Sequence, residues 1–205
     1  MTWAQIQLDS IRKMFVNTAA IAATDLPSMR SDKKYITYLD AMPDTATEGL
    51  MIMATRGKPI LNRDVLDAED NDSTYPIEGY YCFDLTDALT NYVALESIYV
   101  DGKTYLGYVL RDNKYLYIPE DICDEHTVVV SYNSCPKITA TTPDTDIIAA
   151  PIDMLNILPL YIASELYKDD DIALATYYRN EFETELENMR KQPTDIHFVD
   201  VKGWL

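Results

Sequence analysis

The side chains that could do chemistry are few, and their spacing does not support it. Neither of the two histidines, His126 and His197, has a second histidine four residues away or a cysteine pair nearby, as a zinc site requires. The chain also lacks GxSxG, a phosphate loop and GxGxxG, and its six glycines leave little material for a phosphate cradle. We therefore identify no catalytic, cofactor-binding or metal-binding residue, and we expect His126 to lie at the surface where a strand begins.

Two acidic clusters resemble cation sites only in composition. If Asp70 began an EF-hand loop, Tyr75 would occupy the glycine position and Tyr81 the position of the bidentate glutamate. The cluster is more simply a solvated loop, although cation binding by residues 64–75 stays open. Residues 169–171 fit the turn before a helix. The paired carboxylates of glycosidases are defined only in space, and no residue pattern favours them, so we predict a non-enzymatic protein without a cofactor.

The composition narrows the classes of partner. The chain has 205 residues, a net charge of −17 and a pI near 4.3, so its surface repels nucleic acid phosphates and anionic membranes. Its apolar runs are far shorter than a bilayer span, and its first residues do not form a signal peptide. Three cysteines without CxxC spacing indicate free thiols, and we expect folding in a cytoplasm. Sixteen tyrosines suit either β-sheets or extensive subunit contacts.

The last third of the sequence predicts two antiparallel helices. Apolar residues at spacings of three and four predict a helix over residues 152–167, with a kink or a fresh start at Pro159. The run 168–171 ends this helix with a lysine and opens the next with carboxylates, which suits both helix dipoles. A second amphipathic helix follows, so the two form a helical hairpin.

The first third also predicts helices. Thr2 and Gln5 form a capping box for an amphipathic helix over residues 2–15. Residues 31–40 fit a short helix, with a strand as the alternative. Pro43 suits the first turn of a helix that continues to residue 54 and stops at Gly57.

The middle of the chain changes to a β pattern. Five strands are predicted, over residues 79–84, 92–100, 103–110, 114–118 and 127–132. Asp101-Gly102 between the second and the third is a strong hairpin signal. Five short strands at this spacing indicate a small antiparallel sandwich or barrel.

These elements predict an α+β fold. A helical domain is built from the N-terminal and C-terminal segments, and a small antiparallel β-sandwich or barrel is inserted between them. The predicted parts are an N-terminal helical segment (1–62), a β domain with an acidic entry loop (63–145), the C-terminal helical hairpin (146–193) and a C-terminal extension (194–205). The extension is too apolar for a tail that stays in solvent without packing against another surface. It either docks on its own domain or adds as a strand to another subunit.

Two stretches carry a pattern found in a known family. They are TYLDAMPDTATEGLMIMATRGKPI, residues 37–60, and LPLYIASELYKDDDIALATYYRNEFETEL, residues 158–186, about a quarter of the chain together. The matching positions in the second stretch are Pro159, Tyr161, Ala163, Leu166, Tyr167, Asp169, Asp170 and 178–183. Both stretches resemble head–tail adaptor, or head-completion, proteins of tailed bacteriophages. The β insert is a departure from the smallest adaptors, which are all helical.

The resemblance implies a structural virion protein in the neck between capsid and tail, assembled in the host cytoplasm. Such proteins form a ring, commonly of twelve copies, that binds the portal protein and a tail or tail-completion protein. The genome's double-stranded DNA would pass through transiently and non-specifically, and a negative lumen would not grip its phosphates. No membrane partner is expected.

The proposed interface with neighbouring copies and portal centres on the hairpin and the extension. Its residues are Leu158, Tyr161, Tyr178, Arg179, Phe182, Phe198 and Trp204. One alternative is a tail-completion protein or a ring protein next to the tail tube. Another is a carbohydrate- or protein-binding β module on a helical stalk, with tyrosines as its stacking surface.

Overall fold

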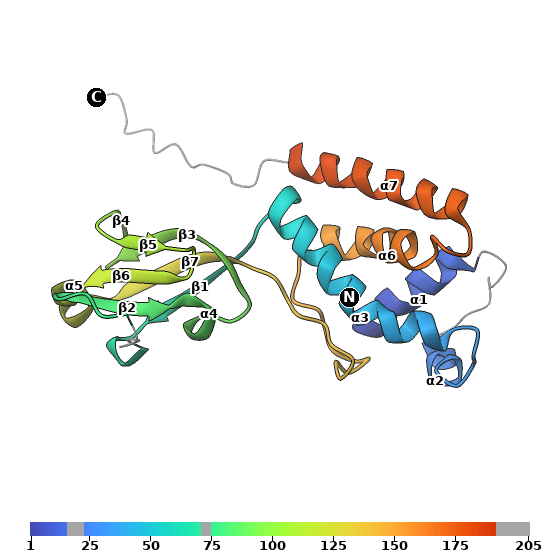
Figure 1. The fold of residues 1–205 in the computed structure, drawn as a ribbon, viewed down its shortest axis with the longest axis horizontal. Coiled ribbons are helices and arrows are strands. Elements are labelled where there is room, and N and C mark those ends of the chain that lie inside the picture. Colours follow the sequence, from blue (N-terminus) through green and yellow to red (C-terminus); the bar gives the residue numbers. More distant parts are fainter. Residues whose placement is uncertain (16–22, 71–74, 192–205) are drawn as a thin grey trace, which may run out of the picture.

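The structure, a computed structural model, describes residues 1–15, 23–70 and 75–191. Figure 1 shows a group of helices beside a group of strands. We call residues 1–15, 23–57 and 146–191 the helical lobe and residues 60–134 the β lobe. The prediction of an α+β fold with antiparallel sheets is confirmed.

The helical lobe combines both ends of the described chain. Its α-helices are α1 (Trp3–Met14), α2 (Leu26–Met29), α3 (Ile36–Ile52), α6 (Ile152–Leu166) and α7 (Ile172–Lys191), with a 3-10 turn at Ala23–Asp25 and a π-helical turn, η2, at Met53–Gly57. Helix α6 packs against α1, α3 and α7 and is buried on nearly every side from Ile157 to Ser164. It is the centre of this lobe's core.

The two ends of the chain meet at α1. Thr2 and Gln5 form the predicted capping box, in which each side chain bonds the other residue's backbone N–H. The backbone N–H of Trp3 donates to the carbonyl of Asp146 at 2.9 Å, and Gln7 donates to the Asp144 carboxylate at 2.9 Å. These bonds fix the start of α1 to the segment that leads into α6.

Two prolines lie inside helices, where other outcomes were predicted. Pro43 was expected in a first turn, but α3 runs through it from Ile36 to Ile52. A kink or a new helix start was expected at Pro159, and no new helix starts there, because one helix spans Ile152–Leu166. An internal proline costs roughly 3 kcal/mol. Both prolines are buried, and the apolar burial around them outweighs that cost.

The β lobe contains two antiparallel sheets. One has the order β1-β7-β3-β4 and the other the order β2-β6-β5. The strands are β1 (Ile60–Leu66), β2 (Tyr80–Asp84), β3 (Tyr92–Val100), β4 (Lys103–Tyr105), β5 (Val109–Arg111), β6 (Tyr115–Pro119) and β7 (Val128–Ser134). Short helices α4 (Leu85–Ala88) and α5 (Glu120–Glu125) and the 3-10 turn Ala68–Asp70 complete the lobe. Its own core includes Phe83, Ile98, Leu116, Val130 and Tyr132.

Strand prediction was wrong in two places. Residues 60–66 form β1, which agrees with the extended conformation expected for residues 58–63, but residues 64–76 were assigned to an acidic loop. Residues 103–110 were predicted as one strand but contribute to β4 and β5, which belong to different sheets. The predicted hairpin is confirmed at Asp101-Gly102, where φ is +48° and +78°. Both values match the turn that joins twisted antiparallel strands.

The lobes are joined by the paired strands β1 and β7. The Asn133 side chain, which is 5% exposed, accepts from the backbone of Ile60 at 2.8 Å and donates to the carbonyl of Ala54 at 2.9 Å. Beyond β7, Thr47 of α3 accepts from the backbone of Ile138 at 2.9 Å and donates to its carbonyl at 3.0 Å. One buried amide therefore ties the β1–β7 pair to η2, the turn that follows α3.

Candidate functional site

The helical hairpin is held by apolar packing between α6, α7 and α3. Leu158, Tyr161 and Phe182 are 0%, 1% and 0% exposed, and the rings of Tyr161 and Phe182 lie 5.1 Å apart. Gly49 of α3 faces them: a Cβ there would lie 2.7 Å from Tyr161 Cδ1 and 2.8 Å from Leu158 Cδ1. Glycine thus permits the close approach of α3 to α6.

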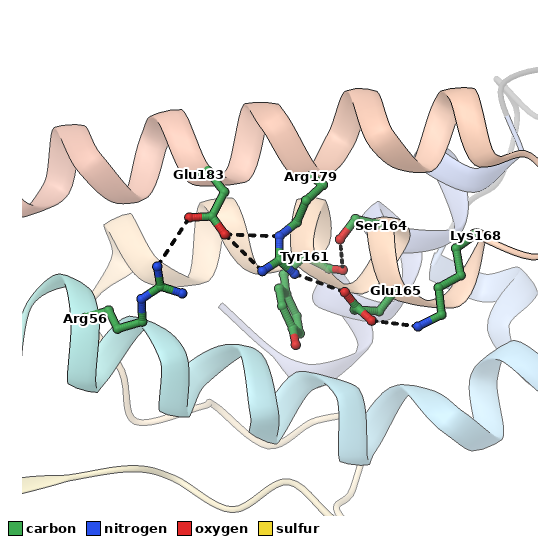
Figure 2. Close-up of polar contacts among 7 residues, drawn as sticks. All are labelled: Arg56, Tyr161, Ser164, Glu165, Lys168, Arg179 and Glu183. Atoms are coloured by element: carbon green, nitrogen blue, oxygen red, sulfur yellow. Dashed lines mark hydrogen bonds and ion pairs between the residues drawn. The ribbon is translucent and has the colours of Figure 1, made fainter.

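A row of alternating charges crosses the rim of this core (Figure 2). Arg179 of α7 donates from Nη1 to Glu165 of α6 at 3.0 Å, and from Nε and Nη2 to Oε1 of Glu183 at 3.1 and 2.9 Å. Arg56 lies 3.9 Å from the other oxygen of Glu183, and Lys168 donates to Glu165 at 3.0 Å. The row links η2, α7, α6 and the turn after α6.

Arg179 also covers the aromatic core. Its guanidinium carbon lies 5.3 Å from the Tyr161 ring centre and 5.8 Å from that of Phe182. Burial, with the nearby carboxylates of Glu48 and Glu165, raises the pKa of Tyr161 to about 12. The phenol therefore stays protonated at neutral pH.

Tyr178 fixes α7 to α1. Its hydroxyl donates to the carbonyl of Lys13 at 2.8 Å, and the Lys13 ammonium lies 5.5 Å from its ring centre. A shallow groove of about 390 Å³ lies beside this contact, lined by Asp9, Arg12, Lys13 and Tyr178. Tyr178 is 9% exposed, so it lines this groove with a small part of its surface.

The placement of the predicted interface residues divides them into three groups. Leu158, Tyr161 and Phe182 are buried in the chain's own core, so in this conformation they cannot contact a partner. Their role is corrected to core packing, because apolar spacing alone does not distinguish a core from an interface. Tyr178 and Arg179 lie at the rim of that core. Phe198 and Trp204 lie outside the described residues.

The exposed face of α7 was missed at the sequence level. Five exposed, uncharged residues recur along it at spacings of three and four: Ala173, Tyr177, Asn180, Thr184 and Asn188. Such a stripe is unexpected in a chain with a net charge of −17. The same sequence rule that finds apolar core faces would find it if it were applied to charge.

Another open surface lies along α3. A groove of about 470 Å³ is formed by α3 and the segment after β7, and its lining includes Met51, Ile52 and Ile138 beside Glu48 and Lys137. The segment is held there by the two hydrogen bonds with Thr47. The groove is wide and shallow, unlike an enclosed small-molecule site.

The described part of the chain contains no group of three or more residues suited to hold a metal ion. Burial raises the pKa of both Cys123 and Cys135 to about 11, so these thiols stay protonated at neutral pH. His126 is exposed as predicted, with Nδ1 2.7 Å from the Asp101 carboxylate. Among the described helices, none is long and apolar enough to cross a membrane.

No protein-family model matches the sequence. No curated protein matches it either. The site must therefore be interpreted from its own geometry and from the sequence pattern of the hairpin.

Proposed function

We propose that this chain is a structural protein of a tailed bacteriophage virion. In this proposal it is a head-to-tail adaptor that forms a ring, of twelve copies by resemblance, below the portal. The ring joins the capsid to the tail at the neck and lets double-stranded DNA pass. Its partners are other copies of itself, the portal protein and a tail or tail-completion protein.

The observation that carries this proposal is where the adaptor-like residues lie. Tyr161 packs on Phe182, and Tyr167 packs on Phe15 with ring centres 5.6 Å apart. Asp170 accepts from the Tyr38 hydroxyl at 2.6 Å. The pattern therefore describes how the hairpin is built and joined to α1 and α3, which is the part that adaptor-like proteins would share.

The surface of the hairpin also supports assembly. The uncharged stripe on α7 can lie against a neighbouring copy without bringing carboxylates together. The remaining surface is strongly acidic overall, which suits a lumen that DNA must slide through without being bound. Repeated contacts of this head-to-tail kind close into a ring when the rotation between copies closes.

We further propose that the fold is organised as a helical domain interrupted by a β-sandwich. The helical core draws residues from both ends of the chain, whereas the β core lies between Leu66 and Tyr132. In the ring, the helical hairpin would face the neighbours and the portal. The β lobe would project outward or toward the tail.

The test is the mass of the purified chain, alone and with the portal protein of the same phage, measured by light scattering. We expect a ring with a mass near twelve times the 23.4 kDa of the chain, formed alone or on portal. Electron microscopy of virions labelled for this chain should place it at the neck. A chain that stays monomeric with portal, and is absent from the neck, contradicts the proposal.

A pair of variants makes the test specific to the α7 stripe. Asn180→Lys places a charge in the middle of the stripe, and we expect it to prevent assembly while the fold is retained. Leu106→Lys is the matched control, because Leu106 is 82% exposed in the β lobe. Equal assembly of both variants would remove α7 from the interface.

A further inference from the structure

The β lobe presents one long sheet edge. Among the described strands, β1 and β4 end one sheet, and β2 and β5 end the other. β4 and β5 have three residues each and β2 has five, whereas β1 has seven. The register of β1 with β7 is continuous from Ile60 to Leu66, so its outer side is a straight row of backbone donors and acceptors.

β1 has few of the features that protect an edge strand. Its sequence, ILNRDVL, contains no proline, and Leu61 and Val65 are each 52% exposed. Its two charged side chains are both engaged with neighbours in the sheet. Arg63 lies 5.4 Å from the Tyr99 ring, and Asp64 accepts from the Tyr132 hydroxyl at 2.6 Å. An added strand would therefore meet exposed apolar side chains.

The chain itself supplies a segment of the right composition. Residues 196–201, IHFVDV, follow the described part of the chain and are rich in β-branched and aromatic residues. In an extended strand, Ile196 and Phe198 would share one face, and Val199 and Val201 the other. Whichever of these two faces lies on the side of the exposed Leu61 and Val65, the strand therefore offers them apolar side chains.

The distance that the chain can span decides whether the extension pairs with β1 of its own copy or with β1 of a neighbouring copy. The end of α7 lies beside the start of β1: Arg190 and Gly57 line one groove, and Leu186 packs against Gly57. In Figure 1 this end of α7 lies above the helical turns that lead into β1, on the side of the helical lobe that is turned toward the strands. A segment leaving that point along its own β1 would run parallel to it. Every described strand pair in the protein is antiparallel.

Within one copy, residues 192–195 are too few to let the extension pair antiparallel with its own β1. The segment would first have to travel the length of β1, about 23 Å for seven residues. The four residues 192–195 extend over roughly 14 Å at most. A second copy has no such constraint.

We propose that residues 196–201 of one copy add as an antiparallel strand to the free edge of β1 in the next copy. This inference rests on the proposed ring and names the contact that would link its members. Backbone hydrogen bonds would give the affinity, and the alternating apolar side chains would set the register. Each copy would supply one extension and accept one, as a closed ring requires.

The test mixes two chains that each carry one added cysteine in a Cys123→Ser background, where the remaining Cys82 and Cys135 are buried, at 1% and 3% exposed. One chain carries Val65→Cys and the other carries Phe198→Cys or Val199→Cys. Residues 198 and 199 lie on opposite faces of an extended strand, so the two mixtures test both faces. After mild oxidation we expect a covalent dimer from at least one mixture. The matched control replaces Val65→Cys by Leu106→Cys, a position between β4 and β5 that is 82% exposed, and should give at most a tenth of that yield.

The outcomes separate this inference from the ring itself. An assembly of ring mass that gives no more dimer than the control overturns the strand addition and leaves the adaptor proposal intact. A chain with both Val65→Cys and Val199→Cys that forms only a fast-migrating monomer also overturns it, because the extension then binds its own copy. A dimer from chains that never join portal supports the strand addition and contradicts the adaptor proposal.

Discussion

The two lobes solve the same packing problem with different parts of the chain. The helical core unites residues near the start, such as Trp3, with residues near the end, such as Phe182, around the buried α6 helix. The β core uses a continuous stretch between β1 and β7, with β7 paired on both sides. The comparison teaches that loss of either terminus should damage the helical lobe directly and the β lobe only through their junction.

The largest expected effect on stability comes from removing a buried aromatic side chain from the helical lobe. Phe182→Ala removes a side chain that is 0% exposed, and we expect it to lower the free energy of unfolding by about 3–5 kcal/mol. Denaturant unfolding measures the loss. Hydrogen exchange should show it first in α6 and α7, with the β strands affected later.

Tyr177→Ala is the control for Phe182→Ala, because Tyr177 lies on the same helix and is 59% exposed. It should change the free energy of unfolding by less than about 0.5 kcal/mol. If Phe182→Ala opened β3 and β7 as early as α7, the lobes would unfold as one unit and the comparison would fail.

A smaller effect separates two kinds of glycine. Gly49→Ala would push a Cβ to within 2.7 Å of Tyr161, so we expect about 1–3 kcal/mol of destabilisation by overpacking. Gly102→Ala has open space around it but a φ of +78°, and this backbone costs an L-residue roughly 1–2 kcal/mol.

Substitution by asparagine tells the two glycines apart. Asparagine tolerates positive φ, so Gly102→Asn should be more stable than Gly102→Ala. Gly49→Asn adds more volume to a full site and should be less stable than Gly49→Ala. Thermal melts of the four variants measure both differences, and the same order at both positions would refute the distinction.

The sequence predicted the local elements better than their connections. The capping box of Thr2 and Gln5, the hairpin at Asp101-Gly102 and the helical hairpin follow from interactions between residues close in the chain. The continuity of α3 and α6 could not be predicted, because burial that offsets an internal proline comes from distant residues. Pro43 was therefore placed in the first turn of a helix, and Pro159 at a kink or a fresh helix start.

The sequence predicted which helices form the candidate site, but not which of their side chains are exposed. Spacing placed Tyr161 and Phe182 on the hairpin, and only the fold shows that they face inward. β1 was expected to be extended only as far as residue 63, because its five central residues are exposed and mix charges with apolar groups, as a loop does. Its strand conformation comes from pairing with β7, which is far away in sequence.

Acid should affect the β lobe through Asp84. Despite its burial, hydrogen bonds from Lys114 and Thr86 lower the pKa of this carboxyl below its usual 3.8. The stability that comes from a lowered pKa is fully present above pH 3.8 and is lost as pH falls through the folded-state value. Unfolding followed from pH 6 to pH 2 should therefore show a loss that is smaller in Asp84→Asn. An equal acid loss in both proteins would assign it to other carboxylates.

The smallest expected effect is the removal of Arg179 from the charge row. Its side chain is 35% exposed and its partners Glu165 and Glu183 are 29% and 38% exposed, so water screens each pair. Arg179→Met keeps much of the cover over Tyr161 and should cost only about 1 kcal/mol, with the cost shrinking in 1 M salt. A double-mutant cycle with Glu165→Gln should give a coupling below about 1 kcal/mol. A coupling of several kcal/mol that ignores salt would mean that the row, rather than the apolar contact of Tyr161 with Phe182, holds α6 to α7.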